Sequence, residues 1–150
     1  MTAGSTLVVL DTNTVMALWW WQDPKLASLA CALDAGVFQP VARADTLDEL
    51  THVLAYRQFG VPPERQAELL AAYTARCALC PEPADEPVLL PRCRDADDQK
   101  FLEVARDAGA TLLISRDKAL LRVDRHSLVR GMFRVRTPEA VCAELSAASA

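Results

Sequence analysis

Short apolar segments alternate with amphipathic ones along this chain, and the alternation limits its fold more than any other feature. Thr6 to Leu10 and Thr111 to Ile114 are brief runs of aliphatic and β-branched residues, typical of buried parallel strands. Further strands are predicted over 37–41 and 132–135. Strands that alternate with helices predict an α/β fold, a three-layer α/β/α arrangement with a central mostly parallel sheet. Ligands of such sheets bind beyond the carboxyl ends of the strands.

Helical patterns fill the segments between the predicted strands. Their apolar residues recur every three or four positions, and several begin near proline or end at glycine. A proline-rich segment at 81–91 is predicted to be a loop, and the basic segment that ends at Arg130 is predicted to be irregular. The helices are expected over 14–21, 24–36, 46–56, from Pro62-Pro63 through Tyr73, over 98–109 and from Pro138 onward.

Length and composition fit one globular domain. The chain has 150 residues, of which 51% are hydrophobic and 24% charged. Domains of this size are common, so residues 1–150 are expected to form a single domain. Asp11, Thr12 and Asn13 interrupt the apolar stretch near the start, which therefore resembles neither a membrane span nor a secretory signal. We expect a cytoplasmic protein that does not bind membranes.

Five cysteines do not suggest a disulfide framework, because the number is odd and no secretory signal is present. Cys77 and Cys80 form a C-x-x-C pair, which is half of a common zinc site. The usual second pair is absent from the sequence. The favoured interpretation is that these are small buried thiols at a helix end.

The net charge of −4 argues against a protein that holds nucleic acid by phosphate neutralisation alone. It is compatible with a nuclease, because a cluster of metal-binding carboxylates makes the metal-free chain acidic. Bound cations then reverse the sign of the electrostatic field where the substrate lies.

Four carboxylates are placed where the predicted fold would bring them together. Asp11 and Asp117 follow the two apolar strands, and Glu49 and Asp98 lie in the predicted first turns of helices. A strand's carboxyl end and the amino end of the next helix share one edge of the sheet. We therefore expect the four to converge there, with oxygen ligands of the kind that Mg²⁺ and Mn²⁺ prefer.

Each carboxylate also has a purely structural explanation, because acids are favoured near the amino ends of helices. Thr46 to Glu49 matches a capping box, Asp95 can cap the helix that follows it, and Asp117 can cap a short turn at 118–121. The pair of aspartates at strand ends favours a metal site nonetheless. Their mutual repulsion in the folded state is tolerated mainly where a cation neutralises it.

The order and spacing of four motifs resemble those of the PIN-domain nucleases. The similarity covers nearly the whole chain and is closest to bacterial PIN proteins that act as toxins of toxin-antitoxin pairs. The motifs are Leu10-Asp11-Thr12-Asn13, the Glu49-Leu50 helix with Val53-Leu54, Asp95-x-x-Asp98-x-x-Phe101-Leu102, and Leu113-Ile114-Ser115-Arg116-Asp117.

This resemblance implies a divalent-metal-dependent ribonuclease with Mg²⁺ or Mn²⁺ as cofactor and RNA as substrate. It implies that Asp11, Asp98 and Asp117 bind the principal ion. Glu49 would orient a bound water or hold a second ion. The expected products carry 5′-phosphate and 3′-hydroxyl ends. A cognate antitoxin and a homodimer or higher homo-oligomer are the implied protein partners.

The resemblance also assigns supporting residues. Thr12, Asn13 and Ser115 match positions that brace the site by hydrogen bonding. Asp98 is preferred over Asp95 as the third ligand because it lies three residues before Phe101, the spacing of the family motif. Asp95 then becomes the cap of the helix, with contact to the ion through water as the alternative.

Several basic and aromatic residues are candidates for contact with a nucleic acid. Solvated surface charge and burial in the core are the competing explanations, and burial is favoured for the tryptophans, one of which could cover a dimer contact. The basic candidates are Arg43, Arg57, Lys100, Arg116, Lys118 and Arg122, and the aromatic ones are Trp19, Trp20 and Trp21.

Three other functional classes compete with the nuclease. One is an RNA-binding or protein-interaction module whose site is catalytically idle. An aspartate-nucleophile phosphatase needs a second aspartate two residues after the first, where this chain has Asn13. A phosphotransfer receiver needs paired acids after its first strand, and these are also missing.

Overall fold

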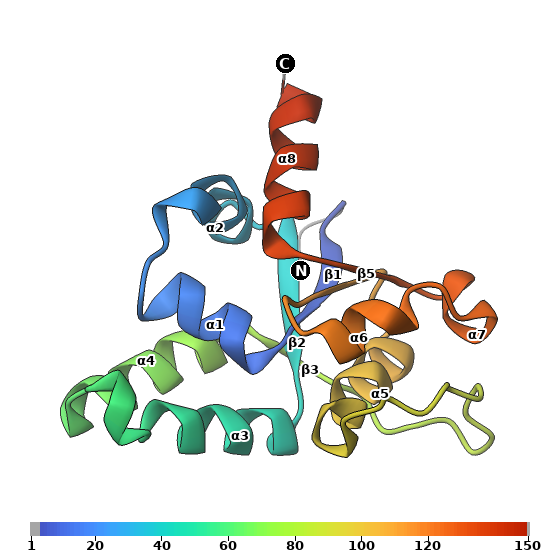
Figure 1. The fold of residues 1–150 in the computed structure, drawn as a ribbon, viewed down its shortest axis with the longest axis horizontal. Helices are drawn as coiled ribbons and strands as arrows, with labels where there is room; N and C mark the ends of the chain where they lie inside the picture. The colour runs from blue at the N-terminus through green and yellow to red at the C-terminus, as the bar shows by residue number, and fades with distance from the viewer. Residues whose placement is uncertain (1–3, 150) are drawn as a thin grey trace.

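Five parallel strands form the central sheet of the computed structural model, which describes residues 4–149 (Figure 1). Their order across the sheet is β3-β2-β1-β4-β5, and every neighbouring pair is parallel. This confirms the predicted parallel sheet. The strands are β1 Thr6–Leu10, β2 Phe38–Ala42, β3 Ala78–Leu79, β4 Leu112–Ile114 and β5 Arg134–Arg136.

Helices cover both faces of the sheet, which completes the α/β/α layers (Figure 1). Short 3₁₀ turns lead into or follow several of them. The α-helices are α1 Thr12–Trp19, α2 Ala27–Asp34, α3 Ala44–Leu54, α4 Pro63–Arg76, α5 Gln99–Ala108, α6 Lys118–Val123, α7 Ser127–Arg130 and α8 Pro138–Ser149. The 3₁₀ turns are η1 Pro24–Leu26, η2 Arg57–Phe59 and η3 Ala96–Asp98.

Two hydrophobic clusters, one on each face, hold the helices to the sheet. Val8 and Leu10 point into the cluster that contains residues of α1, α2, α3, α4 and α8. Val9 points into the other cluster, with residues of α5, α6 and α7. The alternation follows from the two-residue period of a strand. A strand buried on both faces has no polar side, which explains the continuous apolar run in the sequence.

The structure corrects the predicted start of α3. The helix begins at Ala44, and its N-cap residue is Arg43 rather than Thr46. The Thr46 hydroxyl accepts a hydrogen bond from the Arg43 N–H at 3.0 Å. Thr46 is therefore the third helical residue of the capping box, not its first residue. Glu49 therefore lies in the second turn of the helix, not the first, and takes no part in capping.

Other differences lie where the sequence signals were weak. The segment expected to be irregular contains α6 and α7, and the last strand is 134–136 rather than 132–135. The two-residue strand β3 was not predicted, and Cys77 and Cys80 lie on either side of it. Cys77 does end α4, as its C-cap residue. None of the described helices combines the length and apolar character needed to cross a bilayer.

The three consecutive tryptophans separate as they leave α1. Trp19 packs edge-on against Tyr73 with ring centroids 5.0 Å apart. Trp21 packs against Phe59 at 5.1 Å and keeps 50% of its surface exposed. Trp20 is partly buried against the same core cluster as Trp19. Their separation follows from the end of α1 at Trp19, after which the chain turns at Trp20 and bends at Trp21.

Candidate active site

The strand order creates a crevice at the carboxyl ends of β1 and β4. From β1 the chain proceeds outward to β2 and β3, whereas β4 and β5 lie on the other side of β1. Such a reversal is where open α/β sheets bind ligands. Asp11 directly follows β1, and its N–H donates a hydrogen bond to the Ile114 carbonyl at the end of β4 at 3.2 Å. The loop containing Ser115 and Asp117 therefore starts beside Asp11.

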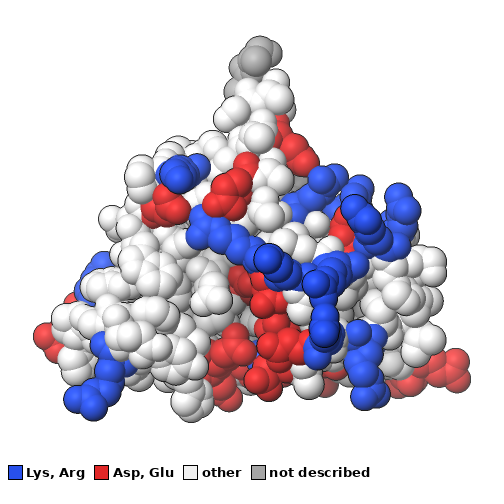
Figure 2. Space-filling view, viewed as in Figure 1, with Lys and Arg blue, Asp and Glu red and all other residues white. Residues whose placement is uncertain are grey.

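A pocket of about 190 Å³ opens in this crevice and contains all four predicted carboxylates. Figure 2 shows Asp and Glu side chains gathered on this face, with a band of Lys and Arg side chains alongside them. The lining residues directly follow β1, lie in α1, α3, η3 and α5, or lie just past α3 and β4. They are Asp11, Thr12, Asn13, Glu49, Val53, Tyr56, Asp98, Phe101 and Asp117.

Asp11 is held rigidly at the base of the pocket. Its side chain is only 5% exposed and accepts a hydrogen bond from the Thr14 N–H at 2.9 Å, which caps α1. The Ser115 hydroxyl, fully buried, donates to its other oxygen at 2.5 Å. Burial raises the pKa of Asp11, while the hydrogen bonds from Ser115 and Thr14 oppose that rise.

Asp117 caps a helix and faces the pocket at the same time. Its Oδ1 accepts hydrogen bonds from the N–H groups of Ala119 at 2.9 Å and Leu120 at 3.1 Å. Its Oδ2 accepts none from the described residues. Ser115 links this residue to the base of the pocket, because its hydroxyl oxygen accepts from the Asp117 N–H at 2.9 Å. The capping explanation and the pocket position therefore coexist.

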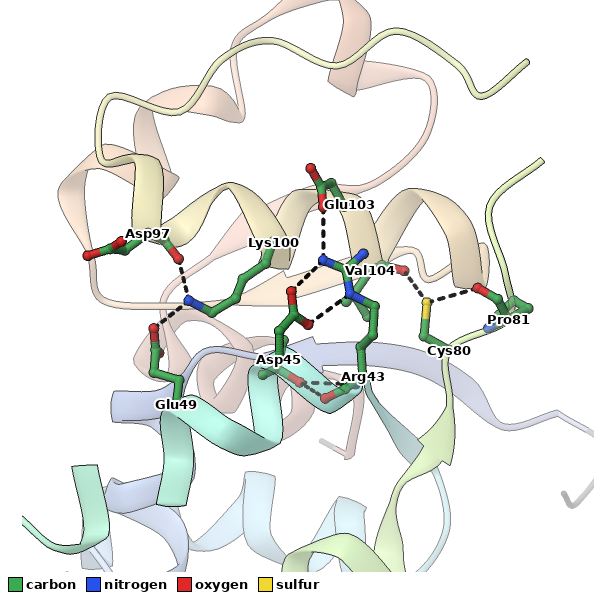
Figure 3. Close-up of polar contacts among 10 residues, drawn as sticks. Arg43, Asp45, Glu49, Cys80, Pro81, Asp97, Lys100, Glu103 and Val104 are labelled. Atoms are coloured by element: carbon green, nitrogen blue, oxygen red, sulfur yellow. Dashed lines mark hydrogen bonds and ion pairs between the residues drawn. The ribbon is translucent and has the colours of Figure 1, made fainter. Parts of the chain in front are cut away.

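Glu49 enters the pocket from α3 with both carboxylate oxygens engaged. Oε2 accepts a hydrogen bond from the Thr12 hydroxyl. Oε1 forms an ion pair with the Lys100 ammonium at 2.6 Å (Figure 3). The partnership with Lys100 was not predicted, because the two residues lie 51 positions apart and meet only when α3 packs beside α5.

Asp98 is the carboxylate with the fewest stabilising contacts. It is partly exposed, and its side chain accepts no hydrogen bond from the described residues. Partial burial, followed by repulsion from Asp117, Asp95, Glu49 and Asp11, raises its pKa from 3.8 to about 7. The pocket thus holds more negative charge than its own residues neutralise.

The structure separates Asp95 from Asp98. Asp95 is exposed, and its side chain accepts a hydrogen bond from the Asp97 N–H at 3.0 Å, which caps η3. Asp98 ends η3 and lines the pocket, whereas Asp95 does not. Asn13 also lines the pocket, but its side chain makes no hydrogen bond with the described residues.

Three lining residues, Val53, Tyr56 and Phe101, were not singled out from the sequence as part of a site. Val53 follows Glu49 by four residues, so one turn of α3 places both on the same side. Tyr56 continues that line just past the helix and is 46% exposed. Their spacing of three or four residues, along the chain from Glu49 and from Asp98, was the signal that could have identified them.

The donors of the pocket suit a hard divalent cation, because carboxylate oxygens are its preferred protein ligands. Within residues 4–149, however, no three side chains of His, Cys, Asp or Glu lie close enough together to form a ready set of ligands. Three of the acids already have partners. The Ser115 hydroxyl donates to Asp11, Lys100 forms an ion pair with Glu49, and a backbone N–H at the start of α6 donates to Asp117. Coordination therefore requires side-chain rotation toward the ion.

A larger hollow of about 420 Å³ lies elsewhere, between α1, α2 and α4. Its walls are mostly apolar. The two acids on it are paired with arginines, Asp23 with Arg116 and Asp34 with Arg76. With its carboxylates already neutralised, this hollow is less suited to metal or phosphate chemistry than the smaller acidic pocket.

Comparison with known proteins gives one family match. A family model described as PIN domain matches residues 7–119, which contain all of the pocket-lining residues. No curated protein matches the sequence.

Proposed function

Because this chain belongs to the PIN-domain family, we propose that it is a divalent-metal-dependent ribonuclease that hydrolyses RNA phosphodiester bonds. Members of this family are generally metal-dependent nucleases that use divalent ions. The observation that carries the proposal is the gathering of four carboxylates in one pocket at the reversal point of the sheet. Asp98, whose charge is opposed by burial and by repulsion from the neighbouring acids, is a group that a bound cation would stabilise.

Each acidic residue has a proposed role in the reaction. Asp11, Asp98 and Asp117 would hold Mg²⁺ or Mn²⁺. When bound, such an ion lowers the pKa of water and stabilises the charge that develops on the phosphate. Ser115 fixes the orientation of Asp11 and of the Asp117 backbone. Glu49 would orient the attacking water from the opposite side of the pocket.

The acidic pocket needs nearby cations to hold an anionic substrate, and α6 provides two of them. Lys118 directly follows Asp117, and Arg122 lies one helical turn later. Both side chains are exposed, and neither forms an ion pair with the described residues. Of the other basic candidates, Arg43, Lys100 and Arg116 are each paired with carboxylates. Arg57 is exposed on η2, beyond α3, and forms no ion pair with the described residues. We propose that Lys118 and Arg122 contact RNA phosphates.

Reversing both charges, with Lys118→Glu and Arg122→Glu, should weaken RNA binding about tenfold or more at low salt. The two lost contacts should reduce the slope of log affinity against log salt by about 1.4, at about 0.7 per contact on a single strand. Fluorescence anisotropy with a labelled single-stranded RNA measures both, in an Asp11→Asn background and with EDTA so that the RNA stays intact. Arg65→Glu on α4 is the control and should change neither; an unchanged slope in the double variant would reject these contacts.

Incubation of the purified protein with end-labelled single-stranded RNA tests the activity itself. Cleavage is expected with Mn²⁺ or Mg²⁺ and should disappear with EDTA. The products should carry 5′-phosphate and 3′-hydroxyl ends, which enzymatic end-labelling distinguishes from 2′,3′-cyclic phosphates. Protein that neither cuts RNA nor binds either ion would refute the proposal.

A finer part of the proposal is that the chain acts as the toxin of a toxin-antitoxin pair. It rests on the likeness of the four motifs to bacterial PIN toxins, with a cognate antitoxin and a homodimeric or larger state as the associated partners. The test is whether expression of the chain arrests growth and whether co-expression of a neighbouring gene product relieves the arrest.

The rival function is a PIN-like module without catalysis that binds RNA or protein. Two observations favour it: the described residues contain no ready set of three metal ligands, and Glu49 already forms an ion pair with Lys100. A biological effect that survives Asp11→Asn unchanged would support this rival.

A further inference from the structure

Lys100 places a positive charge at the edge of the acidic pocket. Its Nζ lies 2.6 Å from Glu49 Oε1 and 2.5 Å from the Asp97 carbonyl oxygen (Figure 3). It also lies 5.4 Å from the centre of the Phe101 ring. The side chain is only 17% exposed. Contacts with two elements, α3 and η3, fix the ammonium in one position.

The contacts of Lys100 divide the four carboxylates into two classes. Glu49 is neutralised by the ammonium, and its second oxygen accepts from Thr12. Asp11, Asp98 and Asp117 form no ion pair with any described lysine or arginine. The charge that still needs a cation therefore lies on the aspartate side of the pocket.

We propose that Lys100 is a built-in cation that takes the place of a second metal ion, so that the pocket binds one divalent ion through its aspartates. Glu49 stays outside the coordination shell as a positioning residue, held by Lys100 and Thr12. A second divalent ion at Glu49 would have to displace the ammonium or lie within a few ångströms of it, where like charges repel strongly. The inference rests on the proposed metal-dependent function and decides between the two roles considered for Glu49.

Counting bound Mn²⁺ by isothermal titration calorimetry tests this inference without RNA. The native protein should bind one ion. Lys100→Met keeps the apolar stem but removes the charge, and it should bind two ions, the second more weakly. Lys100→Arg should restore a count of one. Lys25→Met is the matched control, since Lys25 is exposed on η1 and does not line the acidic pocket, and it should also bind one ion.

Replacing Glu49 provides a second test of the same ion count. Glu49→Gln should bind one ion, and Lys100→Met combined with Glu49→Gln should return from two ions to one. A purely structural ion pair would alter thermal stability but not these counts. Lys100→Gln serves the same purpose if the methionine variant does not fold, as judged by circular dichroism.

The possible results separate this inference from the proposed function. Two ions in the native protein, or one ion of unchanged affinity in Lys100→Met, would overturn the role of Lys100 alone. One ion in the native protein without any RNA cleavage would leave that role intact and count against the nuclease. A native protein that binds no Mn²⁺ would overturn both the metal dependence and this inference.

Discussion

Asp11→Asn is expected to reduce Mn²⁺-dependent RNA cleavage at least about 100-fold, because replacing even an outer partner of a metal ligand commonly costs 10- to 100-fold. Asparagine has the same shape but lacks the negative charge that a cation requires. The fold should survive the change. Burial already disfavours the charged form of Asp11, and the amide oxygen can still accept from the Thr14 N–H.

Initial cleavage rates at saturating Mn²⁺, together with thermal unfolding of the same samples, measure this effect. Asp48→Asn is the matched control, because Asp48 is an exposed acid on α3 next to Glu49 and does not line the pocket. It should keep the native rate. Native-like cleavage by a folded Asp11→Asn protein would remove this residue from the reaction.

Asp98→Asn should stabilise the metal-free protein at pH 8 while impairing its activity. The pKa of Asp98 is raised to about 7 in the folded state, so the folded protein binds this proton more tightly than the unfolded chain does. Stability is therefore lost as the pH rises from about 4 through 7, and the full penalty is present above pH 7. Solvent screening of this partly exposed group limits the gain to about 1 kcal/mol, or about 2–4 °C in Tm.

Thermal unfolding in EDTA at pH 8 and pH 4.5 measures the gain, which should be small at the lower pH. Asp124→Asn offers a control of opposite sign. The Arg134 guanidinium lowers the pKa of Asp124, so its stabilisation is present at pH 8 and fades as the pH falls through its folded pKa. A lower Tm for Asp98→Asn at pH 8 would show that the charge on Asp98 is not the source of strain.

These two predictions concern the same balance between stability and cation binding. Acids held close together destabilise the empty pocket, yet their charge is what a cation would bind. Functional sites often retain such local costs, while the rest of the fold supplies the compensating stability. Lys100 offsets the repulsion at Glu49 only, so the charges of the aspartates still need an external cation.

The sequence by itself determined the layers of the fold and the locations of two acids. Continuous apolar runs can be buried only as strands covered on both faces, and their alternation with helices requires a parallel sheet. Asp11 directly follows one such run, and Asp117 lies three residues past Ile114 at the end of another. Because the ends of parallel strands have little freedom, both acids had to lie at the same edge of the sheet.

Tertiary structure alone decided the remaining features of the pocket. The family spacing favoured Asp98 over Asp95, but the path of η3 is what turns Asp98 toward the pocket and leaves Asp95 as a cap. Glu49 looked like a capping residue until the start of α3 at Ala44 placed it a turn further along. Its pairing with Lys100 depends on two helices that are distant in sequence. Local patterns specify where helices and strands form, but the neutralisation of a charge depends on which side chains the packing brings within a few ångströms of it.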